Sequence, residues 1–89
     1  MSNPDETLLT FPCSFPIKAM GYASTDLELT IQEIVRSHAP DTSDAAFSKR
    51  YSSNGKFLSI TATIEATSRA QLDAIYLALS ANKDILMSL

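Results

Sequence analysis

The sequence predicts an α+β fold in which two helices cover one face of a four-stranded antiparallel sheet. Three features predict it: segments in which apolar and polar residues alternate, segments with apolar residues at helical spacing, and an Asn-Gly pair between two expected strands. In chain order, the expected elements are strand, helix, strand, strand, helix, strand. That order is typical of the split βαβ, or ferredoxin-like, βαββαβ sandwich.

The expected elements all lie within residues 14–89, which we interpret as one domain because a chain of 89 residues rarely supports two cores. Residues 1–13 contain Pro4 and Pro12 and are expected to form a polar lead-in. The first ten residues carry no basic side chain, so we expect no ordinary secretory signal. The apolar runs are short, which predicts no membrane span.

The first strand is predicted in SFPIKAMGYA, residues 14–23, where apolar residues alternate with the others. A period of two is typical of a strand with one buried face. Gly21 marks either the end of this strand or a place where another backbone segment comes close. Because only glycine adopts positive φ freely, the sequence favours a conformational role for Gly21 over direct contact with a ligand.

The first helix is predicted to begin near Thr25, because Thr25 and Glu28 have the spacing of a capping box. Asp26 complements the positive end of such a helix, and Pro40 stops it. The residues at helical spacing on its apolar side are Leu27, Ile31, Ile34, Val35 and His38.

A hairpin is predicted around Asn54 and Gly55, the favoured pair for a two-residue type I′ turn. Before this pair, AAFSKRYS predicts a weaker second strand. After it, KFLSITATIEA alternates almost ideally and predicts a central strand with one core face and one polar face.

The second helix is predicted to open at Thr67 or Ser68, since Ser68 and Gln71 have capping-box spacing, and to stop at Asn82. DILMSL then forms a short last strand. Right-handed crossovers put both helices on one sheet face and make the first and third strands central. The opposite face remains open to a partner or ligand. Its expected residues are Lys18, Met20, Phe57, Ser59, Thr61 and Thr63.

The charge balance argues against nucleic acid as a partner. The formal net charge is −3 with only seven Lys and Arg residues, whereas affinity for a phosphate backbone comes from clustered cations. Lys49, Arg50 and Lys56 surround the expected hairpin beside Tyr51 and Phe57, but charged edge strands also discourage aggregation. We therefore interpret these cations as solvent-exposed charges of the hairpin that discourage aggregation, and not as a nucleic-acid site.

No catalytic or metal-binding motif is evident. Cys13 is the only cysteine, which predicts no internal disulfide and favours a reducing cytoplasm. Cys13 and His38 are expected at the same edge of the domain, but no helix N-terminus lies near Cys13 to lower its pKa. The spacings HxxxH, CxxC and a glycine-rich phosphate loop do not occur. We therefore expect that the protein is not an enzyme and that it binds neither a cofactor nor a metal ion.

The segments FP..FPIKAMG, VRSHAP and SSNGKFLSITATIEATSRAQLDAIY resemble the YbeD-like family of small bacterial proteins of unknown function. The resemblance covers most of residues 11–79 and implies a fold similar to ACT-type regulatory domains, which bind small molecules such as amino acids. ACT domains commonly place a glycine between the first strand and first helix, often at a dimer interface. Gly21 and Tyr22 occupy that stretch here.

Two functions follow as hypotheses. The first is a non-enzymatic protein-interaction or regulatory module in the cytoplasm, which is able to form a homodimer and presents its open sheet face or an edge strand to an unidentified protein partner. The alternative is an ACT-like sensor that binds a small-molecule effector near the loop between strand one and helix one. The candidate contact residues are Gly21, Tyr22, Lys18, Met20 and Phe57.

Overall fold

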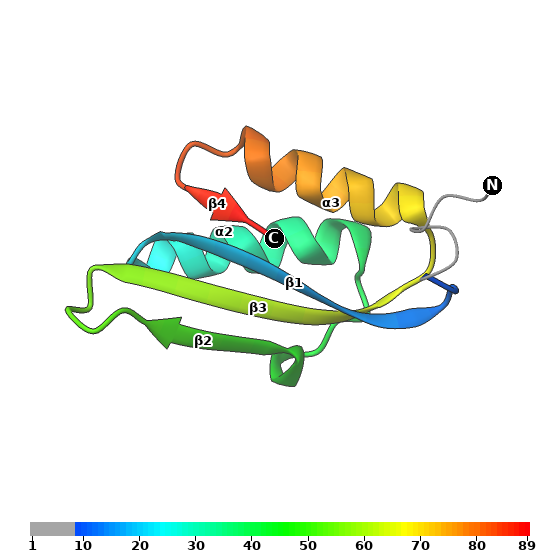
Figure 1. Cartoon of the computed structure of the whole chain (residues 1–89), viewed down its shortest axis with the longest axis horizontal. Coiled ribbons are helices and arrows are strands. Elements are labelled where there is room, and N and C mark those ends of the chain that lie inside the picture. Colours follow the sequence, from blue (N-terminus) through cyan, green and yellow to red (C-terminus); the bar gives the residue numbers. More distant parts are fainter. Residues whose placement is uncertain (1–8) are drawn as a thin grey trace.

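The computed structural model describes residues 9–89 and has the predicted ferredoxin-like architecture (Figure 1). Antiparallel strands form a four-stranded sheet in the order β2-β3-β1-β4, so the first and third strands are central, as predicted. Helices α2 and α3 lie side by side on one face of the sheet (Figure 1). In chain order, the elements are β1 (Cys13–Tyr22), α2 (Thr25–His38), the 3₁₀ turn η1 (Asp44–Ala46), β2 (Phe47–Tyr51), β3 (Phe57–Ala66), α3 (Arg69–Ala81) and β4 (Met87–Ser88).

The two central strands pair along their whole length, from Cys13 beside Ala66 to Tyr22 beside Phe57. Alternate side chains of both strands point toward the helices and form the sheet side of the core. Each buried leucine or isoleucine contributes roughly 1.5–3 kcal/mol, so a slip by one residue would be very costly. The buried apolar residues from these strands are Ile17, Ala19, Leu58, Ile60, Ala62, Ile64 and Ala66.

Each helix presents one apolar stripe to this sheet. The buried helix residues are Leu27, Ile31 and Val35 of α2, and Leu72, Ile75 and Leu79 of α3. Tyr76 packs partly against the same core, and burial raises the pKa of its hydroxyl above the ordinary value of 10.0. Within residues 9–89, neither helix has the length and apolar character needed to cross a membrane.

Helix α2 begins one residue earlier than the predicted capping box implies. Ser24 is the N-cap, and its hydroxyl oxygen accepts a hydrogen bond from the Leu27 backbone N–H at 3.0 Å. The prediction that Thr25 caps the helix was therefore wrong, because Thr25 is already helical while Ser24 is extended, with φ −162°. The helix ends at His38, before Pro40, as predicted.

Helix α3 begins at the predicted cap. The Ser68 hydroxyl oxygen accepts a hydrogen bond from the Gln71 backbone N–H at 3.0 Å, and Gln71 Oε1 accepts one from the Thr67 N–H at 2.8 Å. Gln71 Nε2 also donates to the His38 carbonyl at 2.8 Å, which links the start of α3 to the end of α2. Asn82 is the C-cap, as predicted.

The β2–β3 hairpin is present, but the predicted two-residue type I′ turn was wrong. The ladder closes at Ser52 beside Phe57, which leaves residues 53–56 as the loop. Gly55 adopts φ 73°, while no other described residue has positive φ, although a type I′ turn would also require it of Asn54. Asn54 instead uses its side chain, since its Oδ1 accepts from the Ser52 hydroxyl and the Lys56 N–H.

Gly21 lies within β1, is buried and has no positive φ, so the prediction that it needs positive φ was wrong. Glycine is needed here because another backbone segment comes close, which was the other explanation that the sequence offered. A Cβ at Gly21 would collide with the Asp84 carbonyl oxygen and would lie 3.1 Å from a Leu27 methyl group. Gly21 therefore lets the α3–β4 connection pass close to β1.

The predicted lead-in, residues 1–13, lies mostly outside the described residues. Of its described part, Leu9, Phe11 and Cys13 pack against the core, and β1 already begins at Cys13. At the other end of the chain, β4 is short. Leu89 extends its pairing, because Leu89 and Lys18 exchange backbone hydrogen bonds of 2.8 and 2.9 Å.

Candidate functional site: the outer face of the sheet

The sheet face opposite the helices is the candidate site, and we call it the outer face. Side chains that alternate with the core residues of β1 and β3 point to it, because successive residues of a strand face opposite sides. All six residues that the sequence assigns to this face lie there. The register pairs are Tyr22–Phe57, Met20–Ser59, Lys18–Thr61 and Pro16–Thr63.

An aromatic pair stands at the hairpin end of the outer face. The rings of Tyr22 and Phe57 are stacked with centroids 5.2 Å apart and an interplanar angle of 27°. Lys56 Nζ lies 5.7 Å from the Tyr22 centroid and 5.5 Å from the Phe57 centroid. Stacking and cation–π contact each contribute about 0.5–1 kcal/mol at exposed sites, so the three side chains hold one another in place.

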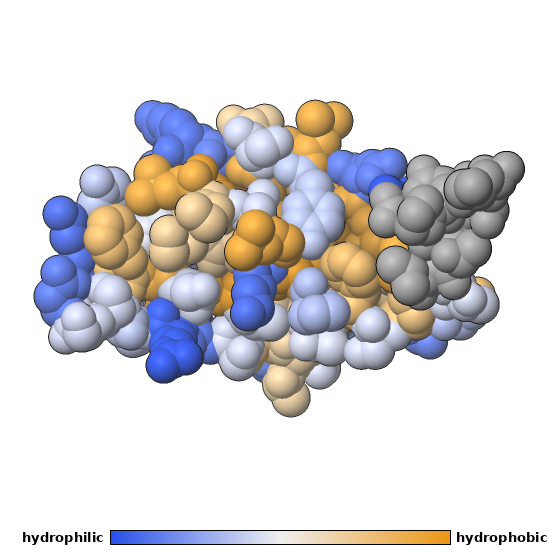
Figure 2. All heavy atoms as spheres, in the orientation of Figure 1, coloured by the Kyte–Doolittle hydropathy of each residue, from blue (hydrophilic) through white to orange (hydrophobic). Residues whose placement is uncertain are grey.

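The β4 edge adds apolar side chains that the sequence analysis did not assign to this face. Met87 pairs with Met20, and Leu89 pairs with Lys18, so both point to the outer face. Met87 is 52% exposed and Leu89 is 69% exposed. Hydrophobic residues gather over β4 and the chain end beside it, bordered by hydrophilic ones (Figure 2). The alternation in DILMSL could have predicted them.

Cations without an acidic partner gather on the outer face. Lys18, Arg50 and Lys56 form no ion pair with any described carboxylate, and Arg50 faces outward beside Ser59. Glu65, beside Ser14 at the far end, is the only acidic residue of β1, β2 or β3. The ion pairs among described residues lie elsewhere: Arg36–Asp44, Lys49–Glu28 and Arg69–Asp73.

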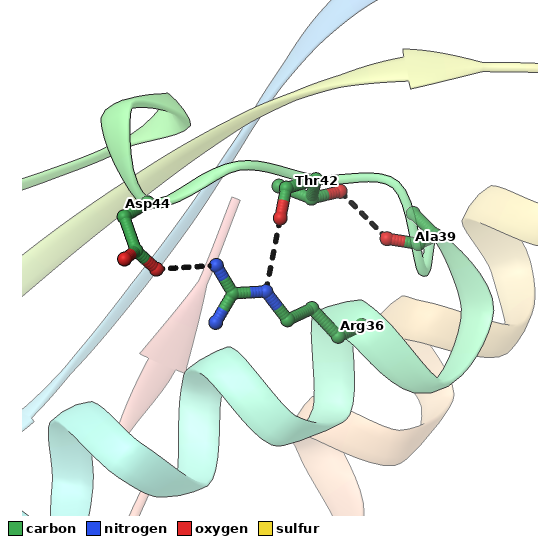
Figure 3. Close-up of polar contacts among 4 residues, drawn as sticks. All are labelled: Arg36, Ala39, Thr42 and Asp44. Atoms are coloured by element: carbon green, nitrogen blue, oxygen red, sulfur yellow. Dashed lines mark hydrogen bonds and ion pairs between the residues drawn. The ribbon is translucent and has the colours of Figure 1, made fainter.

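Arg36 illustrates a cation with a structural role (Figure 3). Its Nε donates to the Thr42 carbonyl at 2.9 Å, its Nη2 contacts Asp44 Oδ1 at 2.6 Å, and its guanidinium lies 5.0 Å from the Phe47 ring centroid. The Thr42 hydroxyl in turn donates to the Ala39 carbonyl at 2.7 Å. These contacts join the last turns of α2 to the following loop and to the start of β2.

An open cleft of about 430 Å³ lies at the C-terminal end of α2. His38, Asp41, Glu65 and Gln71 are among its lining residues. Residues 9–89 contain no group of three His, Cys, Asp or Glu side chains placed to hold a metal ion. Hydrogen bonds order the cleft lining: the Gln71 amide donates to the His38 carbonyl, the Thr67 N–H to Gln71 Oε1, and the Thr42 hydroxyl to the Ala39 carbonyl.

Cys13 and His38, the pair considered for nucleophilic catalysis, lie at the same end of the domain. Cys13 is half-buried beside Ala66 and packs against the core, whereas His38 is exposed in the last turn of α2. Within the described residues, no hydrogen bond joins the two side chains. Cys13 therefore contributes to packing, and His38 stands at the C-terminal end of α2.

Comparison with known proteins places the chain in a family without an assigned activity. The family model described as "Protein of unknown function (DUF493)" matches residues 6–89. A "UPF0250 protein" of Chromobacterium violaceum is 45% identical over 89 residues, covering 100% of both chains. "UPF0250 protein NE1487" of Nitrosomonas europaea is 47% identical over 75 residues, covering 84% of this chain and 86% of the relative.

The fold has a counterpart among solved structures. The solution structure of protein HP0495 from H. pylori superposes with a TM-score of 0.70 at 17% identity, covering 91% of this chain and 85% of that one. At this identity, the likeness concerns the fold alone. The sequence matches confirm the resemblance to YbeD-like proteins, and the chain belongs to the UPF0250 (DUF493) family of small bacterial proteins of unknown function.

Proposed function

We propose that this protein is a non-enzymatic interaction module that presents the outer face of its sheet to a protein partner. The observation that carries the proposal is the composition of that face. Met87, Leu89 and Tyr22 are each more than half exposed there, beside the half-buried Met20 and Phe57. Contiguous exposed apolar surface with a polar border is typical of protein-interaction sites.

The outer face is also rigid, so its backbone needs little rearrangement when a partner protein binds. It stands on the β1–β3 ladder, which runs from Cys13 to Tyr22 without interruption, over a core that is closed by both helices. A surface fixed before binding loses little conformational entropy when a partner docks. Methionine side chains adapt to partner surfaces of differing shape, which suits an adaptor.

The predicted sensor function has less support. A metabolite at Gly21 would compete with the Asp84 carbonyl and with Leu27 for the same space. Two backbone donors at this site are engaged as well, since the Ala23 N–H binds the Lys56 carbonyl and the Leu27 N–H binds the Ser24 hydroxyl. We therefore expect a thermal-shift screen against amino acids and nucleotides to be flat, whereas a dose-dependent rise in Tm would favour the sensor.

We place the module in the cytoplasm, where a reducing environment suits its free cysteine. A second copy is one protein that the outer face could bind. Light scattering of the purified chain measures this directly. A dimer that dissociates when Met20 and Phe57 are replaced by alanine would make the partner a second copy.

The proposed function is tested by comparing capture with two variants of the full chain. The outer-face variant carries Lys18→Ala, Met20→Ala and Phe57→Ala. The control variant carries Leu29→Ala and Leu77→Ala, which remove exposed apolar side chains from α2 and α3.

Tagged wild type and both variants are incubated with extract of the source bacterium, and bound proteins are quantified by mass spectrometry. We expect one or more proteins to be retained by wild type and the control but lost with the outer-face variant. Circular dichroism checks that all three chains are folded. Equal capture by the outer-face variant would contradict the proposal.

A further inference from the structure

The geometry of the outer face points to the chemistry of its partner, and this inference rests on the proposed function. We propose that the outer face binds an extended acidic segment of a protein, with a carboxylate over Arg50 and an apolar side chain over Met20 and Met87. The segment would cross the strands of the sheet rather than add to its edge.

The distribution of charge over the molecule favours an acidic partner. The protein has a net charge of −3, yet Lys18, Arg50 and Lys56 all lie at the outer face without a described carboxylate within ion-pair distance. Its carboxylates lie mostly on the helices and loops, including Asp26, Glu28 and Glu33 of α2. The molecule is therefore polarised, with a locally basic face on an acidic domain. Such a face attracts an acidic partner and repels the outer face of a second copy.

A row of side chains crosses the outer face from β2 to β4. Arg50 stands beside Ser59, Ser59 beside Met20, and Met20 beside Met87, so one row runs from a cation on β2 to two methionines at β4. We call these residues the central row. Neighbouring strands are about 4.8 Å apart, so the row spans about 14 Å.

The spacing of the central row fits an extended chain. Residues four apart in an extended segment are about 13 Å apart and point to the same side. A carboxylate at one position and an apolar side chain four residues later would therefore reach Arg50 and Met87 together. The small side chain of Ser59 leaves room for the backbone between them. Lys18 and Lys56 flank this path and would meet further carboxylates.

Single-stranded nucleic acid is the competing partner for a basic sheet face with aromatic rings. The observations favour protein, because Tyr22 and Phe57 each use one ring face to stack on the other, and Lys56 Nζ lies within cation–π distance of both rings. Base stacking needs a free ring face. Three unpaired cations on an acidic chain also give a weak phosphate-binding surface.

The test is an NMR titration of the ¹⁵N-labelled full chain with a capped nine-residue peptide, Glu-Ser-Glu-Ser-Thr-Ser-Leu-Ser-Ser. Control peptides carry glutamine at both acidic positions, or serine in place of the leucine. We expect shifts at the central row that saturate with the acidic peptide, and roughly tenfold weaker binding of each control. Raising NaCl from about 50 to about 500 mM should weaken the binding of both peptides that keep the glutamates and leave that of the glutamine peptide unchanged.

Protein variants locate the contacts. Arg50→Gln should lower the affinity about two- to fivefold, as should Met87→Ser, while Lys83→Gln, a cation in the α3–β4 connection, should leave it unchanged. Equal binding of the acidic and glutamine peptides, or no shift at millimolar peptide, would overturn the acidic-segment proposal. Tighter binding of an oligouridylate that maps to the same row would overturn it in favour of RNA.

A negative peptide titration and a negative capture experiment lead to different conclusions. If the acidic peptide does not bind but the outer-face variant still loses captured proteins, the outer face is a docking surface for a partner of other chemistry. If the outer-face variant loses nothing, the docking surface itself is refuted.

Discussion

Replacing Gly21 by alanine tests how the last strand is held against β1. The new Cβ would collide with the Asp84 backbone carbonyl and crowd the Leu27 methyl groups, 3.1 and 3.2 Å away. Backbone cannot move aside as a flexible side chain can, so the α3–β4 connection has to shift. That shift would stretch the hydrogen bond of 2.8 Å from the Leu86 N–H to the Met20 carbonyl.

The magnitude follows from these contacts. Overpacking at a tight site costs about 1–3 kcal/mol, and the weakened hydrogen bond costs about 1 kcal/mol. Alanine lowers the entropy of the unfolded chain, which returns about 0.5–1 kcal/mol. We therefore expect Gly21→Ala to lower the free energy of unfolding by about 1–3.5 kcal/mol, measured by urea denaturation followed by circular dichroism.

Gly55→Ala is the matched control, since a Cβ at Gly55 meets nothing within 4 Å and its φ is +73°. It should cost about 1 kcal/mol through backbone strain alone. Amide shifts of Ser88 and Leu89 should change in Gly21→Ala and stay in place in Gly55→Ala. If Gly21→Ala is as stable as wild type with unchanged shifts at β4, the close-approach explanation is wrong.

Three further predictions concern a cap, a ring pair and a titrating group. Ser24→Ala should cost about 1 kcal/mol of stability because the Leu27 N–H loses its acceptor, whereas Thr25→Ala should be nearly neutral; a larger loss at Thr25 would contradict the assigned cap. A double-mutant cycle of Tyr22→Ala and Phe57→Ala should give a coupling of about 0.5–1.5 kcal/mol, and zero coupling would mean that the rings are not stacked in solution. Burial raises the pKa of Tyr76 in the folded state, so the unfolded chain ionises first and stability falls as pH rises above 10.0. Tyr76→Phe should lose part of that alkaline fall in urea titrations, and an unchanged pH profile would refute the assignment.

The arrangement of strands and faces was predictable from the sequence because it depends on local alternation. The inward positions of β3 follow from a pattern of period two, and the register to β1 follows from matching two apolar faces. The same alternation placed Lys18, Met20 and Phe57 on the outer face correctly. Capping by Ser68 and the helix ends at His38 and Asn82 likewise depend on neighbours in sequence.

Other features depend on contacts that a local pattern does not contain. The turn at Asn54 is set by where the ladder closes, at Ser52 and Phe57, and not by the Asn-Gly pair alone. The need for glycine at position 21 arises from Asp84, far along the chain. Within the candidate site, the sequence could not predict that Arg50 has no described acidic partner. That depends on where the fold places the carboxylates, three of which pair with other cations.

Photo-crosslinking in living cells measures most directly whether a protein partner docks on the outer face. Ser59→p-benzoylphenylalanine places the crosslinker in the central row, between Met20 and Arg50. Leu77→p-benzoylphenylalanine places it on the exposed side of α3, where the residue is 72% exposed. We expect a discrete crosslinked species from position 59 and none from position 77. The same crosslink from both positions, or one from position 77 alone, would contradict the account.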